Sequence, residues 1–304
     1  MRKEGMTRRE FIRGAASLAG GLLLSPVAFG AQARRRKRTA VDQVRLGRTG
    51  LRLSRLGIGT GSIGGSIQRN LGQEKFTELI RYTYDQGITY IDTADAYRTH
   101  TMVREAIKGL PREKLFIQSK MGKNTENPLE TLDRFRKELG VEYIDSLLIH
   151  CTVKTNWDDE QKKMMDALEQ AKEKKIILAH GTSCHSLPAL TRAAELEWVD
   201  VNLVRINPQG SHIDTPGEQW NAKSNESHVS AVVEQIKVMR KNRHGIIGMK
   251  LIGEGSFTEA EDREKSIRFV MQPRLLHVAV IGFKSPAEVD EAIKRMNSAL
   301  AEAT

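Results

Sequence analysis

The chain has 304 residues, of which 39% are hydrophobic and 28% are charged. This composition is typical of a soluble globular protein and argues against disorder, and the length suits one large barrel or two small domains. The net charge of +10 could indicate a nucleic-acid partner, but residues 1–33 carry +3 and residues 34–38 carry +5, so the rest is nearly balanced. We therefore expect no nucleic-acid binding by the folded body.

The N-terminus has the features of a targeting signal. Residues 7–13, Thr-Arg-Arg-Glu-Phe-Ile-Arg, place an arginine pair before an apolar run, which is the pattern of a twin-arginine export signal. The run is rich in Gly and Ala and ends at Ala31-Gln32-Ala33, a small-x-small cleavage pattern. We predict a signal peptide over residues 1–33, a basic linker over residues 34–43, and export to the periplasm by the twin-arginine machinery.

An uncleaved signal that anchors the chain in the inner membrane is the alternative. Gly20, Gly21 and Pro26 interrupt the apolar run, which is short for a span of about 20 apolar residues. A cleaved signal is therefore favoured. The basic run Arg34–Arg38 could lie against anionic lipid, which confines any expected membrane contact to the N-terminus and leaves a membrane-anchored scaffold as a further alternative.

The body of the chain alternates between two kinds of hydrophobic pattern. From Val44 to Leu53, apolar and polar residues alternate around a Gly-containing turn, which predicts a β-hairpin. After it, short runs rich in Ile, Leu and Val alternate with segments of 3.6-residue periodicity. The predicted strands are 55–59, 88–94, 114–120, 144–150, 176–182, 199–206, 245–250 and 275–281, and the predicted helices are 73–86, 100–110, 128–139, 158–174, 186–196, 226–242, 259–272 and 285–302.

This strict alternation predicts a parallel sheet covered by helices. A doubly wound sheet would also fit it, but eight strand–helix units within about 250 residues is the size of a TIM barrel. No Pro-rich or Ser-rich linker divides the body. The fold class we expect is α/β, a (β/α)8 TIM barrel with an N-terminal β-hairpin, over residues 44–304.

Polar side chains at the carboxyl ends of the predicted strands are the candidates for chemistry, because a TIM barrel has its active site at that face. Asp92 and Tyr97 follow the second strand, Lys120 closes the third and His150 closes the fourth. Tyr97 can donate a proton to a carbonyl oxygen, and a nearby Lys120 ammonium would lower its pKa. Asp92 would keep Lys120 charged, and His150 could orient the carbonyl as a hydrogen-bond donor.

These four residues, with the Asp-Thr-Ala-x-x-Tyr run that begins at Asp92, resemble the catalytic tetrad of the aldo-keto reductase family. Residues 46–51 and 56–61 also resemble the opening of that family, and the resemblance covers roughly residues 44 to 300. It implies an oxidoreductase that moves a hydride between a nicotinamide cofactor, NADP or NAD, and a small carbonyl or alcohol substrate.

The same resemblance implies where the nicotinamide half of the cofactor lies. Ser183 matches a residue that holds the carboxamide, whereas Cys184 and Leu203 replace the usual Asn and Gln. Asn202 or Asn207 could compensate for the lost contact. Gly59 and Thr60, in the matching opening, are assigned to the cofactor, and Lys250 is expected to contact the pyrophosphate.

The turn before the last helix resembles the family's phosphate-binding turn, in which backbone N–H groups at a helix N-terminus bind phosphate. The family's usual Arg or Gln is replaced by Glu288 and its usual Asn by Ala292. An acidic Glu288 disfavours a cofactor with an extra 2′-phosphate, which weakens the usual NADP preference without establishing NAD. The residues assigned to the cofactor here are Gly282, Phe283, Lys284, Ser285 and Glu288.

Three other questions stay open at the level of sequence. Cys151 and Cys184 follow neighbouring strands, so a disulfide would suit an oxidising compartment, but strict geometry makes unpaired thiols the favoured state. Together with His180 and His185 they match no zinc spacing, and we expect no metal. Because cofactor contacts are altered, a nicotinamide-binding barrel that acts as a sensor or partner subunit with little turnover is the alternative function.

Overall fold

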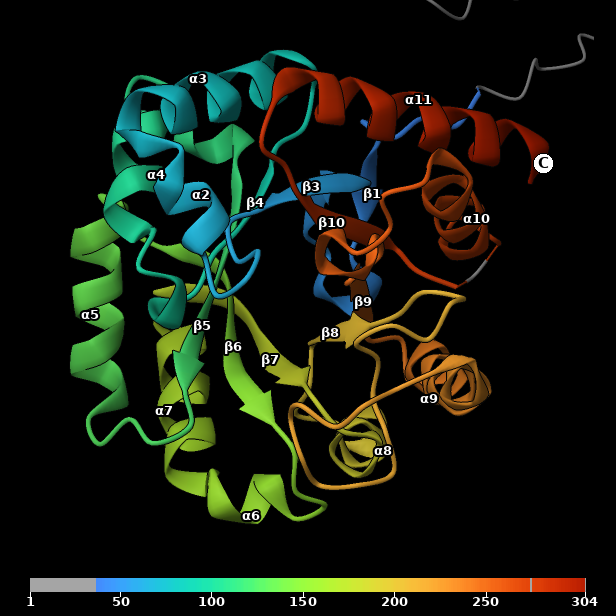
Figure 1. The fold of residues 1–304 in the computed structure, drawn as a ribbon. Coiled ribbons are helices and arrows are strands. Elements are labelled where there is room, and N and C mark those ends of the chain that lie inside the picture. Colours follow the sequence, from blue (N-terminus) through green and yellow to red (C-terminus); the bar gives the residue numbers. More distant parts are fainter. Residues whose placement is uncertain (1–36, 274, 304) are drawn as a thin grey trace, which may run out of the picture. The chain divides into compact units, whose positions relative to one another are not determined.

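The computed structural model describes residues 37–273 and 275–303, and the predicted signal peptide lies outside them. Eight parallel strands close into a barrel in sequence order, with the last strand paired to the first (Figure 1). This confirms the predicted (β/α)8 fold. The strands are β3 (Leu56–Gly59), β4 (Tyr90–Asp92), β5 (Phe116–Gly122), β6 (Ile144–Thr152), β7 (Ile177–Cys184), β8 (Val201–Arg205), β9 (Gly245–Met249) and β10 (Val278–Gly282).

The helices follow the predicted periodic segments with two differences. A short helix, α2, precedes α3, and the predicted helix 158–174 is divided at Gln161, whose backbone leaves the helical region at φ −103° and ψ 14°. The helices are α2 (Ser66–Asn70), α3 (Gly72–Asp85), α4 (His100–Ile107), α5 (Pro128–Leu139), α6 (Trp157–Glu160), α7 (Lys162–Glu173), α8 (Leu187–Glu195), α9 (Val229–Lys241), α10 (Ala260–Val270) and α11 (Pro286–Glu302).

The interior of the barrel is a packed core rather than a pore. A cluster of buried side chains that includes Tyr90, Phe116 and Leu203 fills it, as the layered interior of a TIM barrel requires. Tyr90 is accommodated because Gly57 faces it from the neighbouring strand: a Cβ at position 57 would lie 2.0 Å from the Tyr90 ring. A second, larger cluster packs the helices against the outside of the strands.

The N-terminal hairpin closes the amino end of this core. Strands β1 (Gln43–Arg45) and β2 (Arg52–Ser54) pair antiparallel, as predicted. Leu46 and Leu53 are fully buried in the interior cluster. The short 3-10 helix η1 (Gly47–Thr49) then runs against the start of β9, where the Arg48 backbone N–H donates to the Arg243 carbonyl at 2.7 Å. With this end covered, the carboxyl ends of the strands form the accessible face of the barrel.

Residues 38–43 belong to the folded body rather than to the linker predicted over residues 34–43. Arg38 donates to the carbonyl oxygen of Ala303 at 3.2 Å, and the Ala40 backbone N–H donates to Asn297 at 2.8 Å. Ala40 is fully buried. The linker was predicted from the charge of the basic run alone. The bonds to α11 and to the residue after it, which hold this segment on the barrel, could not be inferred from charge.

No helix in residues 37–273 or 275–303 combines the length and the apolarity needed to cross a membrane.

Candidate active site

The four residues predicted for catalysis meet at the carboxyl ends of β4, β5 and β6. Lys120 is fully buried, and its Nζ lies 2.8 and 2.7 Å from the two carboxylate oxygens of Asp92. It also donates to the Thr93 carbonyl oxygen at 2.9 Å. Burial lowers the pKa of Lys120, and the Asp92 carboxylate opposes that shift. Asp92 therefore anchors the ammonium in the geometry that the sequence predicted.

A second layer of polar groups holds Asp92 in place. Gln118, two residues before Lys120 on β5, donates from Nε2 to Asp92 Oδ1 and to the Tyr90 hydroxyl oxygen, both at 2.9 Å. Burial, followed by the Asp92 charge, raises the pKa of Tyr90 well above its usual range. Because every partner lies on a strand of the barrel, the position of the buried charge is set by the sheet.

Tyr97 lies in the 3-10 helix η2 (Asp95–Tyr97), with the Lys120 Nζ 4.7 Å from the centre of its ring. A Cβ at Gly61 would lie 2.4 Å from two atoms of that ring, so only glycine leaves room for it. Burial first, and then the carboxylates of Asp92 and Glu254, raise the pKa of Tyr97 well above its usual range.

The direction of this shift is opposite to the predicted lowering by Lys120. The ammonium lies over the Tyr97 ring, and both oxygens of Asp92 hold it there. In this structure Tyr97 is therefore a protonated phenol across the neutral range, which suits a proton donor.

His150 closes the arrangement on the other side of Tyr97. Its ring lies edge-on to the Tyr97 ring, with centroids 5.6 Å apart. Burial and the Lys120 charge lower the pKa of His150 to about 3. A neutral imidazole at this position can donate one N–H to a substrate oxygen without carrying a charge. The His185 ring lies next to the His150 ring, with centroids 6.2 Å apart.

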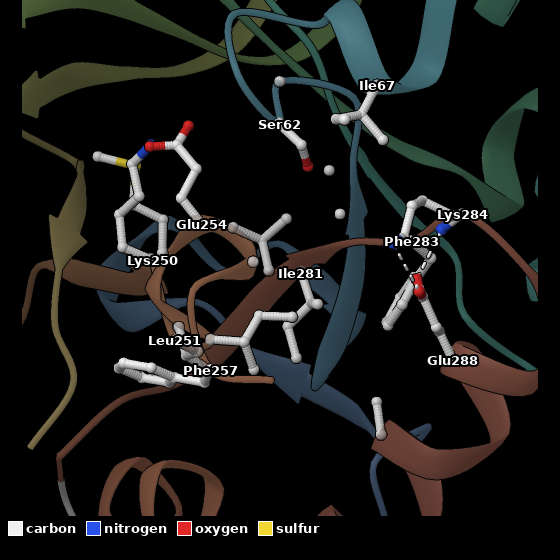
Figure 2. Close-up of a pocket in the computed structure, with 18 of the residues that line it drawn as sticks. Ser62, Ile67, Lys250, Leu251, Glu254, Phe257, Ile281, Phe283, Lys284 and Glu288 are labelled. Atoms are coloured by element: carbon white, nitrogen blue, oxygen red, sulfur yellow. Dashed lines mark hydrogen bonds and ion pairs between the residues drawn. The ribbon is translucent and has the colours of Figure 1, made fainter. Parts of the chain in front are cut away.

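Asp92 and Tyr97 line a pocket of about 530 Å³, whose other lining residues come from the ends of β3, β9 and β10, from the loops that follow them and from α10 and α11. Figure 2 shows part of this pocket. This volume is in the usual range for a cofactor or ligand site, about 300–1,000 Å³. Six of the nine residues predicted to bind the cofactor line it: Gly59, Lys250, Gly282, Phe283, Lys284 and Glu288. The pocket thus joins the reaction end to the predicted phosphate-binding turn.

The remaining three predicted cofactor residues have other roles in this structure. Thr60 is buried and its hydroxyl shares a 2.8 Å hydrogen bond with Thr99. Ser285 caps α11. The Ser183 hydroxyl is buried, and none of the described residues forms a hydrogen bond with it. This leaves a polar atom near the tetrad that a carboxamide would satisfy.

The two asparagines suggested as compensation form hydrogen bonds within the chain. Asn202 is buried and bonded to the His244 ring at 3.0 Å. Asn207 donates to the carbonyl oxygens of Ser211 and Lys250. Leu203 lies in the barrel interior. Both amides are therefore already used to hold the barrel and its loops.

Ion pairs neutralise both lysines of the pocket. Lys250 Nζ lies 2.6 Å from Glu254, and the Ile63 backbone N–H donates to the same carboxylate at 3.1 Å. Figure 2 shows this pair at one end of the pocket and Lys284 with Glu288 at the other. Glu254 thereby connects the loop after β9 to the loop after β3 across the mouth of the pocket.

Several residues in or beside the site were missed by the sequence predictions. His185 directly follows the end of β7, so the strand-end rule could have identified it. Glu254, Arg263 and Arg295 line the pocket. The fold brings the partners of these residues together. The sequence alone does not single them out, because an acidic residue four positions from a basic one is common on any exposed helix.

Both cysteines are free thiols. Cys184 is buried and its Sγ accepts a 3.4 Å hydrogen bond from Thr152, and burial raises its pKa to about 12. Cys151 is half-buried with a left-handed φ of +61°, at an irregularity in the pairing of β6 with β7. Within the described ranges, His, Cys, Asp and Glu side chains form no group of three that could hold a metal ion.

A model of the aldo/keto reductase family matches residues 55–303. The chain belongs to this family. It is 29% identical over 180 residues to probable aldo-keto reductase 1 of Glycine max, covering 52% of this chain and 51% of that protein. It is 30% identical over 166 residues to the 9,11-endoperoxide prostaglandin H2 reductase of Trypanosoma cruzi, covering 52% and 54%. The chain thus spans about half the length of the curated relatives it matches.

Solved structures share the fold over most of the chain. A putative aldo-keto reductase from Pseudomonas aeruginosa has a TM-score of 0.69 at 23% identity, covering 87% of this chain and 98% of that one. An aldo-keto reductase from Klebsiella pneumoniae in complex with NADPH has a TM-score of 0.60 at 17% identity, covering 85% and 89%. At these identities the likeness concerns the fold.

Proposed function

We propose that this chain is an NAD(P)-dependent oxidoreductase that interconverts a small carbonyl compound and its alcohol. One observation carries the proposal: Asp92, Tyr97, Lys120 and His150 meet at one end of a pocket whose other end is the N-terminus of α11. Family membership supports it, and so does the relative from Escherichia coli described as an NADH-specific methylglyoxal reductase, 31% identical over 136 residues.

The residues of the pocket fit an extended dinucleotide. Gly59 and Gly282 leave the strand ends open, and a Cβ at position 282 would lie 2.0 Å from the Ser62 hydroxyl. Lys250 and Lys284 would hold the phosphates. Ser183 lies outside the pocket lining but pairs with His150 on the neighbouring strand, and its buried hydroxyl, without a partner among the described residues, would hold the carboxamide. A bound nicotinamide cofactor would supply or accept the hydride at the Tyr97 end.

The protein supplies the proton and the orientation. In the reducing direction Tyr97, a neutral phenol, donates its proton to the carbonyl oxygen as negative charge develops there. Neutral His150 donates a second hydrogen bond to the same oxygen and fixes the angle of the carbonyl. Lys120, held charged by Asp92, stabilises the phenolate that remains once the proton has left.

Activity with a generic aldehyde tests this proposal. With NADH and NADPH supplied in turn, Tyr97→Phe should lower kcat by about 10²- to 10⁴-fold, the usual contribution of a positioned general acid. Tyr143→Phe is the matched control, because it removes the same hydroxyl from a tyrosine that lies beneath Arg112 and does not line the pocket. Turnover that survives Tyr97→Phe contradicts the mechanism, and failure to bind either dinucleotide contradicts the function.

We also propose that the chain is exported to the periplasm by the twin-arginine route, with residues 1–33 as a cleaved signal. The support is the sequence of residues 7–13 and the Ala31-Gln32-Ala33 pattern. Cell fractionation decides between the alternatives: a shortened chain in the soluble periplasmic fraction is expected, and replacement of Arg8 and Arg9 by Lys should abolish it. Retention in the membrane fraction at full length would instead identify an uncleaved anchor.

A further inference from the structure

The first turn of α11 contains a carboxylate, that of Glu288, which folds back onto the start of the helix. Ser285 caps the helix, and its hydroxyl accepts from the Glu288 backbone N–H at 3.4 Å. The Glu288 carboxylate turns back over the helix start, where one oxygen accepts from the Lys284 backbone N–H at 2.8 Å and the other lies 3.5 Å from Lys284 Nζ (Figure 2). Free N–H groups at a helix N-terminus bind phosphate, and Glu288 accepts one backbone N–H at this helix start that a phosphate could otherwise use.

The two arginines at this end of the pocket are also paired within the chain. Arg263 on α10 and Arg295 on α11 both donate from Nε to the same oxygen of Glu291 at 2.8 Å. Arg295 donates further to Glu264 at 2.5 Å, and Arg263 to two backbone carbonyl oxygens of the loop before α10 at 3.1 and 2.6 Å. These bonds connect α10 to α11, so turning either guanidinium toward a ligand breaks contacts between the helices.

Ala292, the neighbour of Glu288 on the same face of α11, has no side-chain hydrogen-bond donor. Ala292, one turn after Glu288, lines the pocket with a methyl group. The hydrogen bond from Arg263 lowers the pKa of Glu291, which keeps that carboxylate charged. Each cation that lines this end, Lys284, Arg263 and Arg295, thus lies within 4 Å of a carboxylate of the same chain.

The adenosine ribose separates the two dinucleotides chemically. NAD(H) carries a 2′-hydroxyl, which can donate a hydrogen bond to a carboxylate, whereas NADP(H) carries a 2′-phosphate of about −1.5 to −2 charges at neutral pH. An acidic residue at the ribose favours the first, and an unpaired arginine favours the second. We propose that Glu288 makes this pocket select NAD(H) over NADP(H). The inference rests on the proposed function and narrows its cofactor to one of two.

Solvent limits the size of the effect. The Glu288 side chain is 38% exposed, so its repulsion of a phosphate is screened and falls short of the penalty at a dry interface. We expect NADH to bind about tenfold more tightly than NADPH, a difference typical of one screened charge contact.

Equilibrium binding tests the inference without any turnover. The 304-residue chain is titrated with NADH and NADPH by nicotinamide fluorescence, and with adenosine 5′-monophosphate and adenosine 2′,5′-bisphosphate by calorimetry. Glu288→Gln keeps an oxygen that can accept from Lys284 and should narrow the NADH preference to about threefold or less, while Glu288→Arg should reverse it. Glu130→Gln is the matched control, because Glu130 occupies the same position in the first turn of α5, is exposed and lies outside the pocket.

The outcomes are distinguishable. A preference for NADH that shrinks in Glu288→Gln and persists in Glu130→Gln supports the inference, whether or not the Arg variant folds. NADPH binding as tightly as NADH in the unmodified chain, or a ratio unchanged in Glu288→Gln, overturns it and leaves the oxidoreductase standing. Binding of neither dinucleotide overturns the proposed function together with the inference.

Discussion

The two ends of the pocket place their ion pairs in opposite environments. At the reaction end, the side chains of Lys120 and Asp92 are 0% and 7% exposed. At the nucleotide end, those of Lys284 and Glu288 are 62% and 38% exposed. A buried pair that loses one partner leaves a desolvated charge, whereas an exposed pair is screened and can rearrange. The first is therefore tied to folding, and the second is free to determine which ligand is bound.

This contrast coincides with the positions at which the sequence keeps, or departs from, the residues that the family resemblance leads us to expect. The reaction end keeps all four expected residues, whose partners lie on strands of the barrel. The nucleotide end replaces the expected residues by Glu288 and Ala292 at the start of an otherwise regular helix. A change of charge there costs the fold little and changes the selectivity of the site.

The largest effect we predict concerns the buried pair. Lys120→Met should lower the free energy of unfolding by about 3–5 kcal/mol, because it strands the Asp92 carboxylate in a desolvated site. Urea denaturation measures it. Lys284→Met, which removes one partner of the exposed pair, should leave the midpoint of urea denaturation unchanged. In the double variant Asp92→Asn with Lys120→Met, most of the loss should be recovered. Equal loss in the single and double variants would show that packing, rather than the stranded charge, dominates.

The next effect concerns the space beside Tyr97. Gly61→Ala places a Cβ 2.4 Å from the ring, so the phenol must move. A displacement of about 1 Å typically costs about 10²-fold in rate. Steady-state kinetics should show this loss in kcat. Gly122→Ala, where the added carbon meets no atom within 4 Å, should keep the activity. Full activity in Gly61→Ala would place the reacting group elsewhere.

The pH dependence should differ between the two reaction directions. Reduction needs the protonated phenol, and since the pKa of Tyr97 is raised well above its usual range, its rate should be flat through neutral pH. Oxidation needs the phenolate, whose fraction grows about tenfold per pH unit below the pKa, so its rate should rise toward high pH. His150, with a pKa of about 3, should add no step. A break near pH 6.5 in kcat would contradict the neutral imidazole.

The smallest effect separates the carboxylates at the two opposite ends of the pocket, Glu254 and Glu288. Glu254→Gln releases Lys250 for a phosphate and keeps an acceptor for the Ile63 N–H. Both dinucleotides should bind about two- to fivefold more tightly, the scale of a partly exposed ion pair. Their ratio should not change, unlike in Glu288→Gln. Fluorescence titration measures both, and a shift in the ratio would mean that Glu254 faces the ribose.

The fold was accessible from sequence because each strand is a short apolar run followed by a periodic segment. The eight parallel strands and the hairpin follow from that pattern, and the strand-end rule then brings Asp92, Lys120 and His150 together. The division at Gln161 and the packing of residues 38–43 on α11 were not accessible. The packing of residues 38–43 depends on tertiary bonds such as that from Ala40 to Asn297.

The electrostatics of the site were less accessible. Sequence reasoning placed an ammonium near Tyr97 and inferred a lowered pKa, but burial and the nearby carboxylates raise it. The ion pair of Arg263 with Glu291 joins two helices, and no spacing in the sequence predicts it. The identity of charged residues can thus be read from the chain, whereas their net effect depends on burial and on which partners share a surface.

The most direct test of the central claim follows the hydride itself. NADH deuterated at nicotinamide C4, on the transferred face, is incubated with the chain and a simple aldehyde, and the alcohol is analysed by mass spectrometry and NMR. We predict one deuterium at the carbinol carbon in the unmodified chain and in Tyr143→Phe, and a rate lower by about 10²- to 10⁴-fold in Tyr97→Phe. Alcohol formed without deuterium at that carbon, or no alcohol at all, would contradict a hydride-transferring barrel.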